Sequence, residues 1–176
     1  MASSAQTQQT AFTKLAAASA EARLQIVTFQ VGTEVFALDI LEVHEIIRFR
    51  QLTRVPNLPN YVEGVLNLRG KVIPVVGLRQ RIGLERKEPS TATKIIVASV
   101  KDDVLGFMVD SVSEVLRLSA DTVEPAPRLG ESEQKYVSGV GKVNDHLLLL
   151  LDLDRLLSEQ ENANVLSAKE AEAMRA

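Results

Sequence analysis

The chain has 176 residues, which is enough for one ordinary domain or two small ones, and its hydrophobic fraction of 45 % allows a core to form. The net charge of −3 argues against sequence-independent nucleic-acid binding, which needs a basic surplus. Cysteine is absent, which excludes disulfides, thiolate metal sites and a cysteine nucleophile. The start of the chain lacks the pattern of a signal peptide, and the longest apolar run, Leu147–Leu151, is far shorter than the roughly 20 residues of a membrane helix. We therefore expect a soluble cytoplasmic protein that does not insert into a membrane.

Composition shifts along the chain predict its divisions. Residues 1–22 are rich in Ala, Ser, Thr and Gln and predict a mobile tail, while the polar, Pro-containing segment 85–93 is the best internal boundary. The expected divisions are 23–158 for the ordered region, roughly 35–88 and 94–151 for its two units, whose terminal segments can cross between them, and 159–176 for an Ala/Glu-rich tail that is helical or disordered.

In chain order, the dominant signal is a series of short strands joined by turns. The predicted hairpins pair 24–31 with 35–38, 64–68 with 72–76, 94–100 with 104–109, and 137–143 with 146–151. Pro56 and Pro59 make the segment 52–60 irregular, and Pro74 predicts an edge or a bulge. Asp152 is a candidate cap for a helix that begins near residue 153.

The two halves share a motif. Tyr61-Val62-x-Gly64-Val65 is repeated as Tyr136-Val137-x-Gly139-Val140, and each Tyr stands 17 residues before a Leu, Leu78 and Leu153. Short strands with close turn signals favour small barrels, which close their own edges. We therefore predict an all-β fold of two five-stranded barrels related by duplication, with a short C-terminal helix. Chance similarity between two β-rich segments is the alternative.

Residues for catalysis are not evident in the sequence. There is no P-loop, no Gly-x-Ser-x-Gly and no His-Glu-x-x-His, and the two histidines, His44 and His146, fall in different halves. Asp152 and Asp154 are better explained as a helix cap and a first-turn acid than as paired catalytic carboxylates. Aromatic residues make up only 4 % and Trp is absent, so platforms for base stacking are scarce. We expect no catalytic, cofactor-binding or metal-binding residues, and we expect a binding or scaffold protein.

Three longer motifs resemble a known family. They are Phe36-Ala37-Leu38-Asp39-Ile40-x-x-Val43-x-Glu45-Ile46, then Pro56-Asn57-x-Pro59-x-Tyr61-Val62-x-Gly64-Val65-x-Asn67-Leu68-Arg69-Gly70, then Gly106-x-Met108-Val109-Asp110-x-Val112-x-Glu114-Val115. Together they resemble CheW, the coupling protein family of bacterial chemotaxis, over residues 24–157. The resemblance implies a non-catalytic adaptor of two SH3-like barrels that links the cytoplasmic tips of methyl-accepting chemoreceptors to the histidine kinase CheA. It also implies ring assembly with CheA regulatory domains or other CheW copies in membrane-associated arrays.

Other readings stay open at this point. The regulatory domain of CheA has the same fold, but the kinase and phosphotransfer segments are missing, and the chain is too short for a fused receiver domain. A CheW-like adaptor of a non-flagellar pathway and a small-ligand-binding β-barrel are the alternatives.

The resemblance places coupling at Val43, Glu45, Gly64 and Arg69, and we add the apolar neighbours Ile46 and Val65. Plain core packing is the alternative for the three aliphatic residues. For Gly64 the alternative is a backbone requirement, either a bulge or a positive φ.

Arg69 interrupts an apolar stretch, which raises the question of its partner. An unpaired guanidinium beside apolar strands is costly, whereas a carboxylate satisfies its donors. We therefore predict an ion pair between Glu45 and Arg69 that holds the second hairpin against the Val43 segment. A solvated turn arginine is the alternative.

Overall fold

The computed structural model describes residues 23–126 and 136–175, and the expected N-terminal tail at 1–22 lies outside this range. The described part is mostly β, as predicted, with short helical segments at the connections and a 17-residue helix at its C-terminal end. Its strands are β1 (Arg23–Val31), β2 (Glu34–Asp39), β3 (Val43–Arg48), β4 (Val62–Leu68), β5 (Lys71–Gly77), β6 (Lys94–Val100), β7 (Asp103–Val109), β8 (Ser111–Ser119), β9 (Val123–Pro125), β10 (Val137–Val143) and β11 (His146–Leu151). Its helical segments are η1 (Ile40–Glu42), α2 (Leu78–Arg81), η2 (Ala120–Thr122), α3 (Leu153–Leu156) and α4 (Glu159–Arg175).

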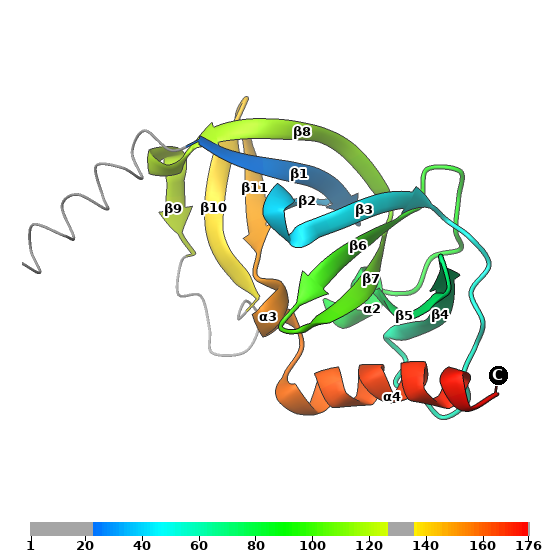
Figure 1. Ribbon diagram of the computed structural model, residues 1–176. Helices are drawn as coiled ribbons and strands as arrows, with labels where there is room; N and C mark the ends of the chain where they lie inside the picture. The colour runs from blue at the N-terminus through cyan, green and yellow to red at the C-terminus, as the bar shows by residue number, and fades with distance from the viewer. Residues whose placement is uncertain (1–22, 127–135, 176) are drawn as a thin grey trace, which may run out of the picture.

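The described strands form two sheets (Figure 1). Sheet A has the order β8-β1-β2-β11-β10-β9, and sheet B has the order β3-β6-β7-β5-β4. All four predicted hairpins are present as antiparallel pairs. One parallel contact joins two hairpins within each sheet: β2 pairs with β11 in sheet A, and β5 pairs with β7 in sheet B.

The sheets do not follow the expected division at residues 35–88 and 94–151. The hairpin β6–β7 lies in sheet B beside β3 to β5, and the hairpin β1–β2 lies in sheet A beside β8 to β11. Each half of the chain therefore gives its first hairpin to the other half's sheet. Sequence periodicity predicts hairpins well but does not reveal which distant strand a hairpin pairs with. That choice is made by long-range packing.

Each sheet has two edge strands that do not pair with each other, so strand pairing does not close either sheet into the expected barrel. In each sheet, however, the chain that follows one edge strand returns to the opposite edge. After β3, Thr53 forms an isolated bridge to Val65 of β4, with N–O distances of 3.0 and 2.9 Å. After β8, the short strand β9 pairs with β10. Both sheets are therefore strongly curved.

The two sheets share their largest buried cluster, and each also encloses a smaller cluster of its own. The shared cluster combines Phe29 and Phe36 of sheet A with Phe107 of sheet B, and the rings of Phe29 and Phe36 stack with centroids 6.0 Å apart. Leu78 of α2 and Leu153 of α3 are both 1 % exposed and belong to the same cluster. A shared core explains how two small sheets with little interior of their own are stabilised.

The repeated Tyr motif has equivalent geometry at both sites. The amide of Gly77 donates to the carbonyl of Tyr61, and the amide of Asp152 donates to the carbonyl of Tyr136, both at 2.7 Å. Each motif also contains a register shift directly before its glycine. Asp152 caps α3, as predicted, by accepting from the amides of Asp154 and Arg155.

The C-terminal segment 159–175 is helical, which was one of the two expectations. Helix α4 lies along sheet B and contacts β4 and β5 (Figure 1). Among the helices of the described residues, none is long and apolar enough to cross a membrane.

Candidate functional site

Strand β3 forms one edge of sheet B and carries three of the candidate residues. Its side chains alternate between half-buried and exposed along the strand. Val43 packs against the main core, whereas Ile46 is 37 % exposed. A register shift between Val43 and Glu45 displaces His44, whose Nε2 lies 2.5 Å from Ser99 Oγ. The edge therefore presents an apolar side chain beside polar ones.

The predicted ion pair between Glu45 and Arg69 is confirmed. Arg69 Nη2 donates to Glu45 Oε2 at 3.0 Å; the arginine side chain is 81 % exposed and the glutamate side chain 26 %. Glu45 lies on the β3 edge of sheet B, and Arg69 lies in the turn after β4, the strand at the opposite edge. A contact between opposite edges requires the sheet to curl. The pair therefore fixes the turn relative to β3 across the mouth of the curved sheet.

The turn that carries Arg69 has an unusual backbone for an arginine. Leu68 pairs with Lys71, so the loop contains only Arg69 and Gly70, with φ values of 53° and 81°. Two-residue hairpins with positive φ at both positions favour Asn-Gly or Asp-Gly. The equivalent turn after β10 uses Asn144 and Asp145, with φ values of 49° and 63°. Arginine at residue 69 is therefore not the choice that turn geometry alone would favour.

Gly64 is required by the backbone, which was the structural alternative for this residue. Its φ is 148°, and a Cβ built on it would lie 2.5 Å from the carbonyl oxygen of Thr53. Any side chain would push apart the bridge between Thr53 and Val65. Gly64 therefore acts on the surface indirectly, by letting the loop before β4 lie against that strand.

Val65 does not belong to an accessible surface. It is 3 % exposed, so in this structure it packs inside the protein, in agreement with the core-packing alternative. Of the residues that we added as apolar neighbours, only Ile46 is available at the surface. The alternation of apolar residues in the sequence could not separate these two positions, because β3 buries one face only in part, whereas Val65 and Leu66 of β4 are both buried.

A hollow of about 270 Å³ lies beside Gly64. It is lined by the loop of residues 54–60 together with Glu63, Gln80 and Arg86. The carboxylate of Glu63 accepts hydrogen bonds from Gln80 Nε2 and from Arg86 Nε, the latter at 3.2 Å, and its side chain is 6 % exposed. Because this carboxylate is already satisfied by two donors, it supports the loop and is not free to act as a base.

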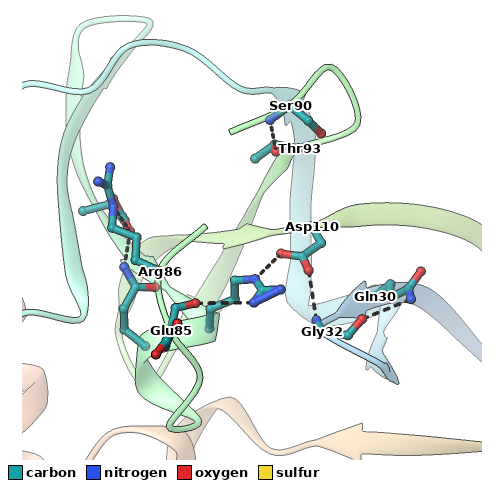
Figure 2. A network of polar contacts seen from close by, with 10 residues as sticks. Gln30, Gly32, Glu85, Arg86, Ser90, Thr93 and Asp110 are labelled. Atoms are coloured by element: carbon teal, nitrogen blue, oxygen red, sulfur yellow. Dashed lines mark hydrogen bonds and ion pairs between the residues drawn. The ribbon is translucent and has the colours of Figure 1, made fainter. Parts of the chain in front are cut away.

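Asp110 joins the two sheets through a polar network that the sequence did not indicate (Figure 2). It follows β7 of sheet B and precedes β8 of sheet A. Its carboxylate accepts from Arg79 Nε of α2 at 3.0 Å and from the amide of Gly32, in the β1–β2 turn, at 2.9 Å. Arg79 Nη1 also donates to the carbonyl of Glu85. The network stabilises the place where the chain passes from β7 in sheet B to β8 in sheet A.

An acidic group lies near the start of β3. Burial, followed by the negative charges of Asp39, Asp152 and Asp154, raises the pKa of Glu42 above its usual value. Among the described residues, no group of three or more His, Asp or Glu side chains is arranged to hold a metal ion. The raised pKa of Glu42 therefore reflects its partial burial first and repulsion by the neighbouring acids second.

Comparisons with known proteins identify similar sequences and a matching family. The profile of the family described as "CheW-like domain" matches residues 25–161. Chemotaxis protein CheW of Klebsiella aerogenes is 36 % identical over 142 residues, covering 80 % of this chain and 86 % of that protein. Chemotaxis protein CheW of Thermotoga maritima is 32 % identical over 142 residues, covering 81 % and 93 %.

A solved structure is also similar. The crystal structure of the scaffolding protein TtCheW from Thermoanaerobacter tengcongensis superposes with a TM-score of 0.73 and 32 % sequence identity, covering 78 % of this chain and 94 % of that one. The family profile spans both sheets and includes the positions of Glu45 and Arg69. The chain therefore belongs to the CheW-like domain family.

Proposed function

We propose that this protein is a non-catalytic adaptor that couples the cytoplasmic tips of chemoreceptors to the histidine kinase CheA. The family match supports the general role, because the relatives are chemotaxis and scaffolding proteins. In this proposal the protein works in the cytoplasm, attached to membrane-bound receptor arrays through its partners. It needs no cofactor, since its task is to hold two proteins in a fixed relation.

The observation that carries the proposal is the ion pair between Glu45 and Arg69. It joins two edges of one sheet at the surface, and the exposed side chain of Ile46 follows Glu45 on the same edge strand. An exposed pair of this kind contributes about 1 kcal/mol or less to folding. Its effect is therefore mainly geometric: it fixes the relative position of β3 and the Arg69 turn. We propose that Val43, Glu45, Ile46 and Arg69 shape the coupling surface, with Gly64 supporting it from below.

We also infer that the two halves arose by duplication and that each curved sheet is an SH3-like barrel. Support comes from the equivalent hydrogen bonds of Tyr61 and Tyr136 and from the return of the chain to the opposite edge in each sheet. Two similar units on one chain suit a ring in which this protein alternates with the regulatory domain of CheA or with further copies of itself.

Reconstitution tests the coupling role. A receptor signalling fragment and CheA are mixed with and without the protein, and both kinase autophosphorylation and co-sedimentation are measured. Receptor control of the kinase is expected only when the protein is present. If kinase output does not change and no ternary complex sediments, the adaptor proposal is wrong.

A further inference from the structure

Helix α4 covers part of sheet B and lies mostly outside the region that carries the proposed function. It contacts β4 and β5, and the family match ends at residue 161, in the first turn of the helix. The helix buries one stripe of its surface, which includes Asn162, Val165 and Ala168. Spacings of three residues are expected for a helix that rests one face on a surface.

The first turn of α4 is well formed and anchored. The amide of Glu161 donates to Ser158 Oγ at 3.1 Å, and the amide of Ser158 donates to Glu161 Oε1 at 3.3 Å, which together make a capping box. The same carboxylate reaches Arg81 of α2, with Arg81 Nη2 at 3.2 Å from Oε1 and Arg81 Nε at 3.1 Å from Oε2. Glu161 thus caps the helix and attaches it to the domain.

Beyond this anchor the helix fits its site poorly. Asn162 is 8 % exposed, and its Oδ1 has no hydrogen-bond partner in the described residues. The buried Oε2 of Glu172 has none either. The remaining unsatisfied buried side-chain atom in the described residues, Arg81 Nε, faces the same helix; it is close to Glu161 but out of line for a hydrogen bond. Burying a polar atom without a hydrogen-bond partner costs free energy. All three unsatisfied buried side-chain atoms of the described residues belong to α4 or face it, so they weaken the packing of this helix.

The surface beneath α4 is suited to a helix. Val165 of α4 belongs to the main buried cluster, against which Tyr61 also packs, and the helix contacts β4 and β5. Tyr61 also hydrogen-bonds the side chain of Asn164. The surface therefore offers apolar groups, a tyrosine hydroxyl and one cation, Arg81, at the end where the helix begins.

We propose that α4 is a displaceable cover over a helix-binding surface formed by strands β4 and β5 together with Tyr61 and Arg81. The fitting partner is an amphipathic helix that places an acidic side chain opposite Arg81 and an apolar side chain where α4 buries Asn162. Such a helix makes the contacts of α4 without burying an unpaired amide. This inference goes beyond coupling at the Glu45–Arg69 surface and does not depend on it.

Native-state hydrogen exchange of the full chain tests whether the cover opens. The amides of Val165 and Ala168 are expected to exchange through openings at least about 100-fold more frequent than those of Ile95 and Ile96 in β6. If the two groups are equally protected, α4 is an integral part of the fold and the proposal is wrong.

Three variants locate the cause of opening. Glu161→Gln keeps a capping residue but removes the ion pair with Arg81, and it is expected to raise the opening frequency about threefold. Asn162→Leu is expected to lower it about tenfold, because the unpaired amide is gone. Glu170→Gln, on the exposed face of the same helix, is the control and is expected to change nothing. An Asn162→Leu variant that opens as often as the parent would contradict the proposal.

A peptide tests the surface itself. The probe is a synthetic peptide of residues 158–175 carrying Asn162→Leu, added to the full-length chain. Saturable binding is expected, together with loss of protection in the chain's own α4. A second peptide that also carries Glu161→Lys is expected to bind at least about tenfold more weakly, because it places a cation opposite Arg81. No binding at concentrations up to about 1 mM would overturn the proposal.

Discussion

Replacing Arg69 with Asn separates the contribution of this residue to folding from its contribution to coupling. Arg69 has a φ of 53°, a left-handed conformation that costs an ordinary residue about 1 kcal/mol and that Asn adopts more readily. The substitution also removes the pair with Glu45. Because the arginine is 81 % exposed, that pair contributes about 1 kcal/mol at most after solvent screening. The two effects have opposite signs and similar size.

The net change in unfolding free energy is therefore expected to lie within about 1 kcal/mol, which is a shift in Tm of about 4 °C or less for a chain of this size. Thermal unfolding measures this shift, and the reconstituted kinase assay measures coupling. We expect Arg69→Asn to leave Tm nearly unchanged while receptor control of CheA is strongly reduced. Lys71→Asn is the matched control, since Lys71 is an exposed neighbouring cation at the same hairpin.

Two results would refute the reasoning. A fall in Tm of about 10 °C would show that Arg69 is needed for folding, so that any loss of coupling is secondary. Full coupling by Arg69→Asn would show that the turn can lose its cation without effect on partners. Equal losses in Arg69→Asn and Lys71→Asn would point to general surface charge as the cause.

Three further predictions concern the support of the surface and its pH dependence. Gly64→Ala is expected to lower the free energy of unfolding by about 2–4 kcal/mol, because it forces a Cβ against the carbonyl of Thr53 at a positive φ. Urea unfolding measures the loss. An unchanged urea midpoint would show that the segment around Thr53 moves freely to accommodate the Cβ. Asp110→Ala is expected to cost about 1–3 kcal/mol, because it removes the acceptors of both Arg79 and Gly32. Asp110→Asn, which keeps one acceptor oxygen but no charge, is expected to cost less, and equal losses in the two variants would contradict this order. Glu42→Gln is expected to raise Tm by about 2 °C or less at pH 7 and to leave it unchanged at pH 4. The folded-state pKa of Glu42 is raised, so folding disfavours the ionised carboxylate that is present at pH 7. This destabilisation disappears as the pH falls below the pKa of Glu42 in the unfolded chain. A larger effect at pH 4 than at pH 7 would reverse the sign of that argument.

Much of the local structure could be predicted from the sequence because its signals are local. Turn residues and alternating apolar residues indicated the four hairpins, and the repeated Tyr motif indicated two equivalent connections, which end in equivalent hydrogen bonds to Tyr61 and Tyr136. The pair between Glu45 and Arg69 was predicted from a local conflict, a guanidinium inside an apolar run. In the structure the guanidinium is 81 % exposed in a turn, so burial does not force the pairing, although the pair with Glu45 forms.

The rest depends on contacts between distant segments. The exchange of hairpins between the sheets is set by which edges pack best, and no single segment encodes it. The links from Asp110 to Gly32 and to Arg79 span 78 and 31 positions of sequence, so nothing in their neighbourhood indicated them. Val65 shows the same limit on a smaller scale: its strand was predicted, but its burial depends on distant parts of the fold, and at 3 % exposure it is inside the protein.

The central claim is that Glu45 and Arg69 act as one unit in coupling, and a double-mutant cycle tests it directly. Receptor-dependent CheA activity and ternary-complex affinity are measured for the parent chain, Glu45→Ala, Arg69→Ala and the double variant. If the pair shapes the surface, either single substitution should cause most of the loss, and the double variant should be little worse than the singles, with a coupling energy of about 0.5–3 kcal/mol. Additive effects of the two substitutions would contradict the account.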